Sequence, residues 1–485
     1  MTIYQVALVA VVLLPAVGAG VVAVFPARLD RAARITGTAF AAVTLLPIIL
    51  LPFARQAGWT AYTASPGALR PWTEVDVSWV PALHLDFHLG VDGVSYPLVA
   101  LTGLLTVLCA AYSLKGPGRA LIALLLVLEA GIAGTFLSFD LILFFLFFEV
   151  VLLPMYAVIA GWGGDDRRRA ARKFVLYTLF GSVFLLLGVV TVAVSAGTAD
   201  LRELTGGAGL DRTTQYAAFT LLAIAFAVKA PLWPLHTWLP DAHTQAPTVG
   251  SVILAGVLLK MGTYGLIRVA VGVTPQGAEK AAPVLGILAA AAIVAGSLIC
   301  LRQTELKRLI AYSSVGHMGF VLLGIATLTT TGLQAALIGN VAHGLITGLL
   351  FFLAGAIKDR AHTGELADLG GLRETAPRLA GVLGFAAIAS LGLPGLAGFW
   401  GEAFAVVAAI QRGGGLWTTL AVLAAIGGAL TAAYFLRLLR RVTHGPAAAP
   451  VSPVIAGREW LAWAPLAALI LAVGLAPALV TGALP

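Results

Sequence analysis

Ionisable side chains lie inside long apolar runs of this 485-residue chain, where a membrane-spanning helix would remove them from water. Five of them carry a formal charge at neutral pH: Glu129, Glu149, Lys229, Lys260 and Glu402. An ionised side chain at the centre of a bilayer costs roughly 2.5–3.5 kcal/mol on insertion scales. Residues that bear this cost usually face the protein interior, pair with one another and mark pathways for ions or protons.

Three histidines accompany these charges: His317 and His343 lie within apolar runs, and His236 follows a proline-rich break. Histidine titrates near neutral pH, and a buried lysine can release and regain a proton there, whereas arginine cannot. Because we expect no arginine within the spans, this set of Lys, His and Glu has the composition that a proton relay needs. The alternative for each residue is a structural ion pair or an interhelical hydrogen bond. Glu129 fits that alternative best.

Other candidate motifs have simpler explanations. His236, Asp241 and His243 lie close together, but no Glu or Cys completes a tetrahedral set at a suitable spacing, so we expect no metal site. Cys109 and Cys300 lie in apolar runs and predict neither a disulfide nor a metal site.

The elements that must position these residues are transmembrane helices. Apolar residues make up 60% of the chain and charged residues only 11%, whereas a soluble domain is typically about half apolar and a quarter charged. This composition excludes a soluble globular protein, a disordered chain and a nucleic-acid-binding protein, although the net charge is +8. In a membrane protein, excess basic residues are typical of cytoplasmic loops beside anionic lipid.

Fourteen apolar runs approach the length of about 20 residues that a spanning helix needs. We therefore predict an all-α, polytopic membrane protein of about 14 transmembrane helices. The runs lie near residues 3–25, 34–54, 94–113, 120–138, 141–161, 174–197, 216–239, 247–271, 282–300, 307–328, 331–356, 379–410, 416–436 and 460–481. No basic residue precedes the first run, which is too long for a signal-peptide core, so we expect it to be retained.

The seventh and twelfth runs contain prolines at matching positions, in Pro231-Leu-Trp-Pro234 and in Gly392-Leu-Pro-Gly395. Proline lacks a backbone donor and clashes with the preceding turn, so both helices are predicted to be discontinuous. Broken helices at corresponding positions indicate inverted repeats around a site at the membrane midplane. We therefore divide the chain into three N-terminal helices (1–113), two inverted five-helix repeats (114–271 and 272–440) and a C-terminal helix (441–485).

Basic residues predict the orientation. Loops after odd-numbered helices hold 21 Lys and Arg residues, and loops after even-numbered helices hold 7. The positive-inside rule therefore places the odd loops in the cytoplasm and both chain termini on the outer side. The longest loop, about residues 55–93, is then on the outer side, where Trp59, Trp72 and Trp79 indicate contact with the membrane interface.

Several motifs resemble those of the antiporter-like membrane subunits of respiratory complex I, the NADH-quinone oxidoreductase. Two of them are Phe147-Phe-Glu149-Val-Val-Leu-Leu-Pro-Met and Val228-Lys229-Ala-Pro-Leu-Trp-Pro-Leu-His236-Thr-Trp-Leu-Pro-Asp-Ala-His243. The stretch from Ala246 to Arg268 looks specifically like the subunit M family of the bacterial enzyme. Further matches are Asp92-Gly93, Lys307 to Gly319, His343-Gly-Leu and Gly392 to Glu402.

The resemblance implies a role for each candidate. It implies that Glu149 pairs with Lys229 and that Lys260 lies at the centre of the proton path. By the same resemblance, His317 and His343 connect Lys260 to an outlet at Glu402, and His236 belongs to the hydrophilic axis. Glu402 also favours the M family, because the two sister subunits usually carry Lys there.

The resemblance further implies a multi-pass, proton-translocating subunit of the bacterial inner membrane, coupled to quinone reduction elsewhere in the complex. It implies that this chain holds no cofactor, and that NADH, FMN, iron–sulfur clusters and quinone bind other subunits. The implied partners are the other membrane subunits, two sister antiporter-like subunits among them, and the lipid bilayer. Two alternatives stay open. One is a subunit of a multi-subunit Na⁺/H⁺ antiporter or membrane-bound hydrogenase, and the other is a purely structural membrane arm.

Overall fold

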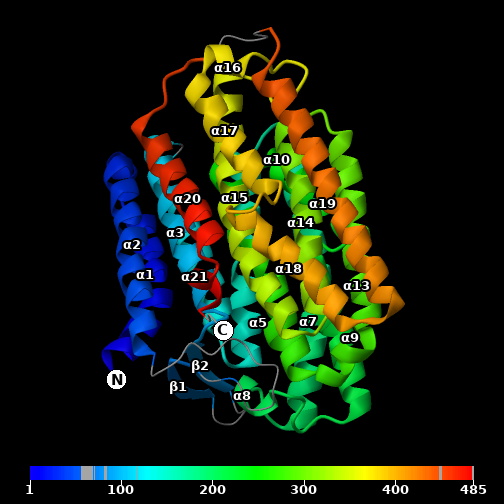
Figure 1. The fold of residues 1–485 in the computed structure, drawn as a ribbon. Helices are drawn as coiled ribbons and strands as arrows, with labels where there is room; N and C mark the ends of the chain where they lie inside the picture. Colours follow the sequence, from blue (N-terminus) through cyan, green and yellow to red (C-terminus); the bar gives the residue numbers. More distant parts are fainter. Residues whose placement is uncertain (56–68, 70, 81–84, 117, 447–450, 483–485) are drawn as a thin grey trace.

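The computed structural model describes residues 1–485 except 56–68, 70, 81–84, 117, 447–450 and 483–485. The described residues form a bundle of helices that run along one common direction, with a small β-hairpin at one end (Figure 1). Within them, twelve helical segments are long and apolar enough to cross a membrane. The predicted class, a multi-pass helical membrane fold, is confirmed, but the hairpin means that the chain is not entirely α-helical.

Among the described residues of the first half of the chain, there are ten helices and two strands outside short 3-10 turns. They are α1 (Ile3–Val24), α2 (Asp30–Leu50), β1 (Thr73–Val80), β2 (Leu85–Val91), α3 (Tyr96–Tyr112), α4 (Arg119–Leu137), α5 (Leu141–Val150), α6 (Leu152–Trp162), α7 (Arg167–Ala196), α8 (Leu201–Leu204), α9 (Arg212–Lys229) and α10 (Trp238–Gln245).

The second half contains the remaining helices. They are α11 (Thr248–Ile253), α12 (Lys260–Gly265), α13 (Pro275–Leu301), α14 (Leu306–Ala326), α15 (Thr330–Ala361), α16 (Leu372–Thr375), α17 (Pro377–Ser390), α18 (Ala397–Arg412), α19 (Gly414–Thr443), α20 (Gly457–Leu475) and α21 (Ala478–Thr481).

The difference between fourteen predicted and twelve observed long spans lies in the two runs that were expected to be broken. In the first, α9 ends at Lys229 and α10 begins at Trp238. In the second, α17 ends at Ser390 and α18 begins at Ala397. The prolines of each break cannot continue a helix. The Trp238 indole partly closes the first break, because its Nε1 donates to the Val228 carbonyl over 3.0 Å.

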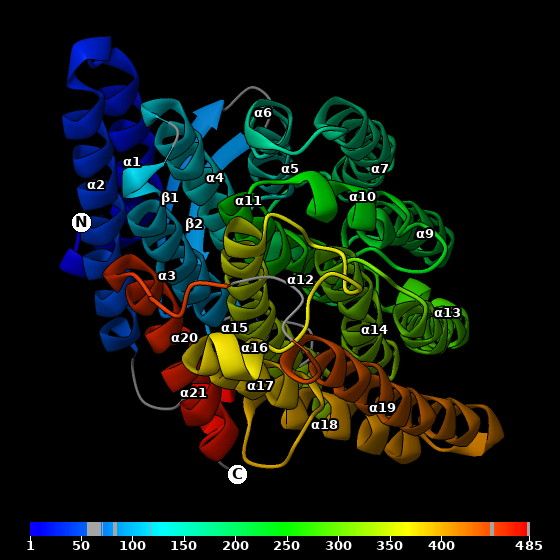
Figure 2. The ribbon, with the colours of Figure 1, turned by 90° about the horizontal axis from the view of Figure 1, so that it is seen from above.

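Burial follows the position of each helix in the bundle. Seen from above, α1 and α2 lie at one edge and α13 and α19 at another, whereas α12 and α15 lie between them (Figure 2). Residues 249–271, which include α12, are all buried. Outer helices instead expose large apolar side chains, such as Leu176 on α7 at 68%. Such extended apolar surface is expected where helices face lipid or a neighbouring membrane subunit.

The β-hairpin lies in the loop that was predicted only as an interfacial segment. Polar and apolar residues alternate from Glu74 to Trp79, a period of two that is typical of a strand and the signal that could have identified it. The hairpin pairs Asp76 with His88 directly across the two strands. Trp79 lies exposed on β1, and Trp59 lies outside the described residues.

Two short backbone bridges, one at each end of the bundle, each involve an acidic residue that precedes a helix. Asp140 pairs with Asp200 near the hairpin, and Glu305 pairs with Glu365 near the loop that leads to α16 (Figure 1). Asp140 caps the start of α5, and Glu305 caps the start of α14, because each carboxylate accepts backbone N–H groups there. The two halves of the chain thus use the same local device with opposite orientation.

Close packing of α15 against α18 provides a test of the fold. A Cβ added at Gly401 would lie 2.6 Å from the Gly339 Cα, so Gly401→Ala must force these helices apart, at a cost of about 1–3 kcal/mol. We expect a lower midpoint of thermal unfolding in detergent. Gly428→Ala on α19 is the control, because its added Cβ meets nothing within 4 Å. Equal midpoints for Gly401→Ala and the unaltered protein would contradict the close approach.

Candidate functional site

Lys260 lies at the centre of the bundle and is completely buried. It begins the short helix α12, and π-helical segments at Leu254–Leu258 and Leu266–Val271 lie on either side. Such wider turns are frequent at functional sites and displace the regular backbone hydrogen bonds. Here the Ala255 carbonyl accepts a hydrogen bond from the Lys260 Nζ over 2.5 Å. The same Nζ lies 2.5 Å from Nδ1 of His343 on α15.

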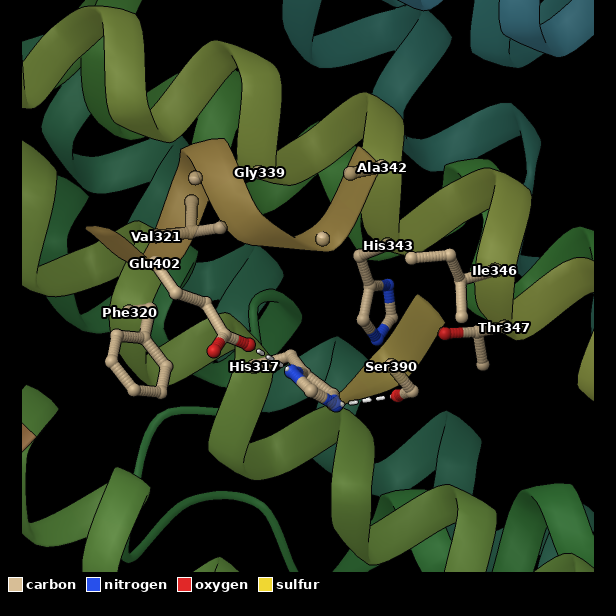
Figure 3. Close-up of a pocket in the computed structure, with 12 residues that line it drawn as sticks. His317, Phe320, Val321, Gly339, Ala342, His343, Ile346, Thr347, Ser390 and Glu402 are labelled. Atoms are coloured by element: carbon tan, nitrogen blue, oxygen red, sulfur yellow. Dashed lines mark hydrogen bonds and ion pairs between the residues drawn. The ribbon is translucent and has the colours of Figure 1, made fainter. Parts of the chain in front are cut away.

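His343 and His317 lie beside one small cavity, with ring centres 6.0 Å apart (Figure 3). An ammonium group can only donate, so His343 Nδ1 accepts from Lys260 and the ring proton is on Nε2. That Nε2 is buried and has no hydrogen-bond partner among the described residues. The cavity has a volume of about 20 Å³. One water needs roughly 10–15 Å³ on the same measure. A single water can therefore connect the two rings.

His317 connects this cavity to Glu402. Its Nδ1 lies 2.7 Å from Glu402 Oε1, and its Nε2 lies 2.9 Å from the Ser390 hydroxyl (Figure 3). An ionised carboxylate only accepts, so Nδ1–H donates to Glu402 and the Ser390 hydroxyl donates to Nε2. The side chains of His317 and Glu402 are 11% and 16% exposed, so the series approaches the protein surface at this end. The break between α17 and α18 brings Ser390 and Glu402 to the same histidine.

Lys229 and Glu149 form a second group, and the expected ion pair between them is absent. No nitrogen–oxygen distance of 4.0 Å or less joins the two side chains. Instead, Lys229 Nζ lies 4.7 Å from the centre of the Phe148 ring and has no hydrogen-bond partner among the described residues. Glu149 accepts a hydrogen bond from Ser182 on α7. The carboxylate is still near enough to act electrostatically on Lys229, and the aromatic face partly stabilises the cation.

The helices that carry the two lysines touch each other. A Cβ added at Gly262 would lie 2.6 Å from the Ala230 backbone nitrogen, so a larger residue would push α12 away from the end of α9. None of the described hydrogen bonds links Lys229 to Lys260 directly. The structure therefore joins Lys260, His343, His317 and Glu402 in one series and places Lys229 beside it.

Two further predicted residues lie outside this series. His236 lies in the break after α9, where its ring centre is 6.2 Å from that of Tyr312 and its Nδ1 has no partner in the described chain. Glu129 is buried on α4, and neither of its carboxylate oxygens has a hydrogen-bond partner among the described residues.

The expectation of no arginine within the spans is wrong. Arg268 is buried in the segment Leu266–Val271, and its guanidinium forms an ion pair with Asp92 at the end of the hairpin. Asp92 also accepts the backbone N–H groups of Val94 and Ser95, at the start of α3. The pair thus ties the segment after Lys260 to the hairpin and to α3. Because arginine keeps its proton, Arg268 holds this structure together and does not carry protons.

Sequence reasoning considered His243 only as a metal ligand and missed Ser390 altogether, although both lie next to the series. Buried His243 on α10 stacks on Phe351, with ring centres 4.5 Å apart, and neither ring nitrogen has a partner in the described chain. Its spacing of seven residues after His236, which lets both histidines lie on one helical face, was the available signal. Ser390 had none, because a serine in an apolar run usually bonds only the backbone of its own helix.

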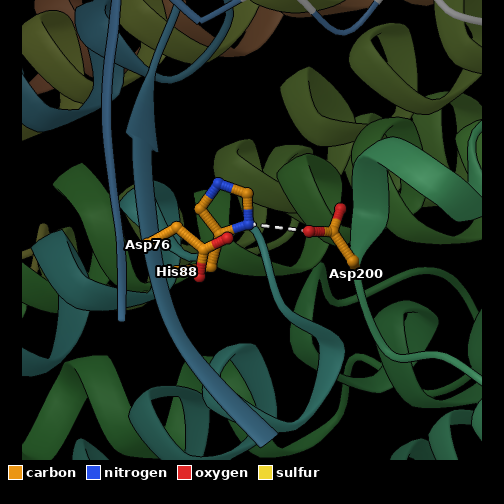
Figure 4. A group of neighbouring side chains, drawn as sticks. All are labelled: Asp76, His88 and Asp200. Atoms are coloured by element: carbon orange, nitrogen blue, oxygen red, sulfur yellow. Dashed lines mark hydrogen bonds and ion pairs between the residues drawn. The ribbon is translucent and has the colours of Figure 1, made fainter. Parts of the chain in front are cut away.

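One group among the described residues contains three side chains of types that bind metals: Asp76, His88 and Asp200, with polar atoms within 4.8 Å of one another (Figure 4). Both nitrogens of His88 are already engaged, at 2.9 Å from Asp200 Oδ2 and 3.3 Å from Glu74 Oε2. Hydrogen bonding therefore accounts for this group.

Comparisons with known proteins identify relatives of the whole chain. A family model for the transmembrane part of NADH:quinone oxidoreductase and Mrp antiporter proteins matches residues 138–430. NADH-quinone oxidoreductase subunit M of Rhodobacter capsulatus is 41% identical over 469 residues, which cover 93% of this chain and 89% of that protein.

Solved structures show the same likeness. A chain of respiratory complex I from Thermus thermophilus, solved with bound NADH, is 30% identical, with a TM-score of 0.86 over 98% of this chain and 97% of that chain. A chain of the Mrp complex from Dietzia sp. DQ12-45-1b has a TM-score of 0.85 over 99% of this chain and 96% of that chain. At 23% identity, the second likeness shows the fold alone.

A hydrogen bond between α12 and α15 tests how firmly the site is held. Thr263 Oγ1 donates to Asn340 Oδ1 over 2.8 Å, and both residues are fully buried. We expect Thr263→Val to lower the thermal midpoint, because such bonds between membrane helices contribute about 0.6 kcal/mol and at most about 1.7. Thr220→Val is the control, since that exposed hydroxyl bonds only the Tyr216 carbonyl of its own helix. Equal midpoints for the two variants would contradict this role.

Proposed function

The chain belongs to the family of membrane subunits of NADH:quinone oxidoreductase and Mrp antiporters, and we propose that it translocates protons within the membrane arm of an NADH:quinone oxidoreductase. The observation that carries the proposal is the series Lys260, His343, His317 and Glu402. Every step in it is one hydrogen bond long or crosses one cavity with room for water. The oxidoreductase is favoured over an antiporter because relatives at 41% identity are subunit M of that enzyme.

The proton moves along the series by successive transfers, after which each histidine carries its proton on the other ring nitrogen and must return to its first tautomer before the next proton passes. Lys260 passes a proton to Nδ1 of His343, which releases its Nε2 proton to the water in the cavity. That water protonates Nε2 of His317 once the Ser390 hydroxyl turns away, and His317 gives its Nδ1 proton to Glu402. Each histidine thus receives a proton at one nitrogen and releases one at the other. Ser390 controls the transfer to His317, because its hydroxyl is bonded to Nε2, the nitrogen that must accept the proton.

Lys229 and Glu149 make proton transfer in this chain respond to events in other subunits. Redox chemistry elsewhere in the complex changes the charge at a neighbouring subunit and so alters the attraction of Glu149 for Lys229. One pKa unit corresponds to about 1.4 kcal/mol, so a modest change in this attraction alters proton binding. We assign the arrangement in which Glu149 bonds Ser182 to the state with the pair open. His236, in the break beside Lys229, is proposed as a further group on this path.

The proposed topology contains two inverted repeats, 114–271 and 272–440, between the N-terminal helices (1–113) and the C-terminal helix (441–485). The similar bridges at Asp140 and Glu305, at opposite ends of the bundle, support this division. The excess of basic residues in the odd loops supports an orientation with both termini and the hairpin on the outer side of a bacterial inner membrane. The proposed partners are the other membrane subunits, including two sister antiporter-like subunits. Flavin, iron–sulfur clusters, NADH and quinone are proposed to bind elsewhere in the complex.

Replacement of the central lysine tests the relay. In the assembled complex, we expect Lys260→Met to lower the number of protons pumped per electron severalfold, because methionine fills the space without carrying a proton. The complex should still assemble and oxidise NADH. Lys280→Met is the control, since this exposed lysine lies over the Tyr216 ring on the outside of the bundle. A normal pumping ratio per assembled Lys260→Met complex would contradict the relay and favour a purely structural role.

The identity of the complex has its own test. An affinity tag on this chain should purify NADH-dependent quinone reductase activity from detergent-solubilised membranes of the source organism. A tagged unrelated membrane protein from the same cells is the control. Recovery of Na⁺/H⁺ exchange activity or of hydrogenase activity, without NADH oxidation, would instead support an antiporter or a membrane-bound hydrogenase.

A further inference from the structure

The group around His88 lies at the hairpin end of the bundle and takes no part in the proton series. His88 is almost completely buried on β2, and its ring lies between two carboxylates. Nδ1 is 2.9 Å from Asp200 Oδ2 (Figure 4), and Nε2 is 3.3 Å from Glu74 Oε2. A neutral imidazole has only one N–H, so it can donate to only one of the two. Only the imidazolium satisfies both carboxylates.

This ring holds together three segments that are distant in the sequence. The His88 carbonyl accepts the backbone N–H of Phe139, 2.9 Å away, and Leu141 N–H donates to the Ala199 carbonyl over 2.9 Å. Leu201 N–H in turn donates to the Phe139 carbonyl over 2.8 Å. The hairpin, the start of α5 and the turn at α8 are therefore joined through their backbones, with His88 bonded across them. Helix α5 carries Glu149.

Acidic groups lie close to His88 on β1, on its own strand, at the turn before α8 and at the start of α5. Glu74 and Asp76 face it from β1, Asp200 from the turn at α8, and Asp86 lies two residues away on its own strand. Asp140 caps the start of α5, and burial raises its pKa to about 6, so it gains charge as the pH rises above that value. A basic group in the described part of the chain, Arg202, lies close by and is bonded to both Glu74 oxygens at 2.7 and 2.8 Å.

We propose that His88 is a proton-sensitive positioning residue, whose imidazolium fastens the hairpin and the turn at α8 to the start of α5 and so fixes the helix that carries Glu149. Loss of the proton breaks one of the two bonds and loosens this junction. The proposal rests on the proposed function, which places the hairpin on the side where protons are released. Pumping acidifies that side, so the junction tightens as the proton gradient builds and relaxes as it falls.

The sign of the pH dependence follows from the surroundings of His88. Burial alone would lower the pKa of His88, but the hydrogen bond and charge of Asp200, with Asp76 and Glu74, raise it above the usual value. A group whose pKa is higher in the folded state contributes its full stabilisation below the unfolded pKa, here about 6.5. That stabilisation is lost as the pH rises through the raised value. The junction is therefore tight under mildly acidic conditions and loose under alkaline conditions.

Hydrogen–deuterium exchange of the purified, assembled complex tests the proposal. After correction for intrinsic exchange, the amides of Phe139 and Leu141 should exchange faster as the pH rises from about 6 to about 9, by about tenfold for each unit of the His88 pKa shift. In His88→Gln this extra pH dependence should disappear. Glu74→Gln removes one of the facing charges and should move the transition to lower pH. His444→Gln, at an exposed histidine in the loop after α19, is the control and should behave as the unaltered complex does.

The same variants link the junction to function through a second measurement. In proteoliposomes, the protons pumped per electron should vary with the pH on the hairpin side in the unaltered complex and not in His88→Gln. Identical exchange profiles in His88→Gln and the unaltered complex would overturn the inference. If His88→Gln fails to assemble, an unshifted transition in Glu74→Gln would do the same. Normal pumping by Lys260→Met would instead overturn the proposed function and leave the exchange result intact.

Discussion

A lysine ammonium in the middle of a membrane must find its hydrogen-bond acceptors within the protein, and the rest of this structure depends on how Lys260 does so. Water and lipid offer it nothing at that depth, and an unpaired charge there costs several kcal/mol. The chain meets the requirement with a backbone carbonyl exposed by a π-helical turn and with one imidazole nitrogen. Both acceptors are neutral, so the lysine is held without an ion pair, and its proton has a direct route to His343.

The broken helices serve the same requirement at the other end of the series. An unbroken helix across residues 377–412 would place Ser390 and Glu402 about 18 Å apart along its axis, at 1.5 Å per residue. The break between α17 and α18 lets both reach His317. Open backbone of this kind survives at membrane depth only where protein surrounds it or where it lines a wet cavity. Here Ser390 and Glu402, on either side of the break, line the cavity beside His317 and His343.

The residues of the structural ion pairs differ in type from those of the proposed proton relay. Arg268 is paired with Asp92, and Arg360 on α15 is paired with Glu459 on α20 at 2.7 Å. Arginine keeps its proton and binds carboxylates rigidly, so these pairs fix helices in place. The proposed relay instead uses lysine, histidine and glutamate, residue types that can exchange protons. The hairpin combines the two kinds of charge, because Arg202 holds Glu74 while His88 can titrate between Glu74 and Asp200.

The sequence by itself determined the membrane class, the two helix breaks and the members of the series, because apolar length, proline position and buried charge are local properties. Lys260, His343, His317 and Glu402 all stand out as ionisable residues in apolar runs. Tertiary structure alone decided which of them touch, since Lys260 and His343 are 83 residues apart and His317 and Glu402 are 85 apart. It also decided that Glu149 bonds Ser182 and not Lys229. In the same way it placed Arg268 against Asp92 and the Ser390 hydroxyl within hydrogen-bond distance of His317 Nε2. Partners of this kind depend on side-chain geometry between helices, which no periodicity along one helix records.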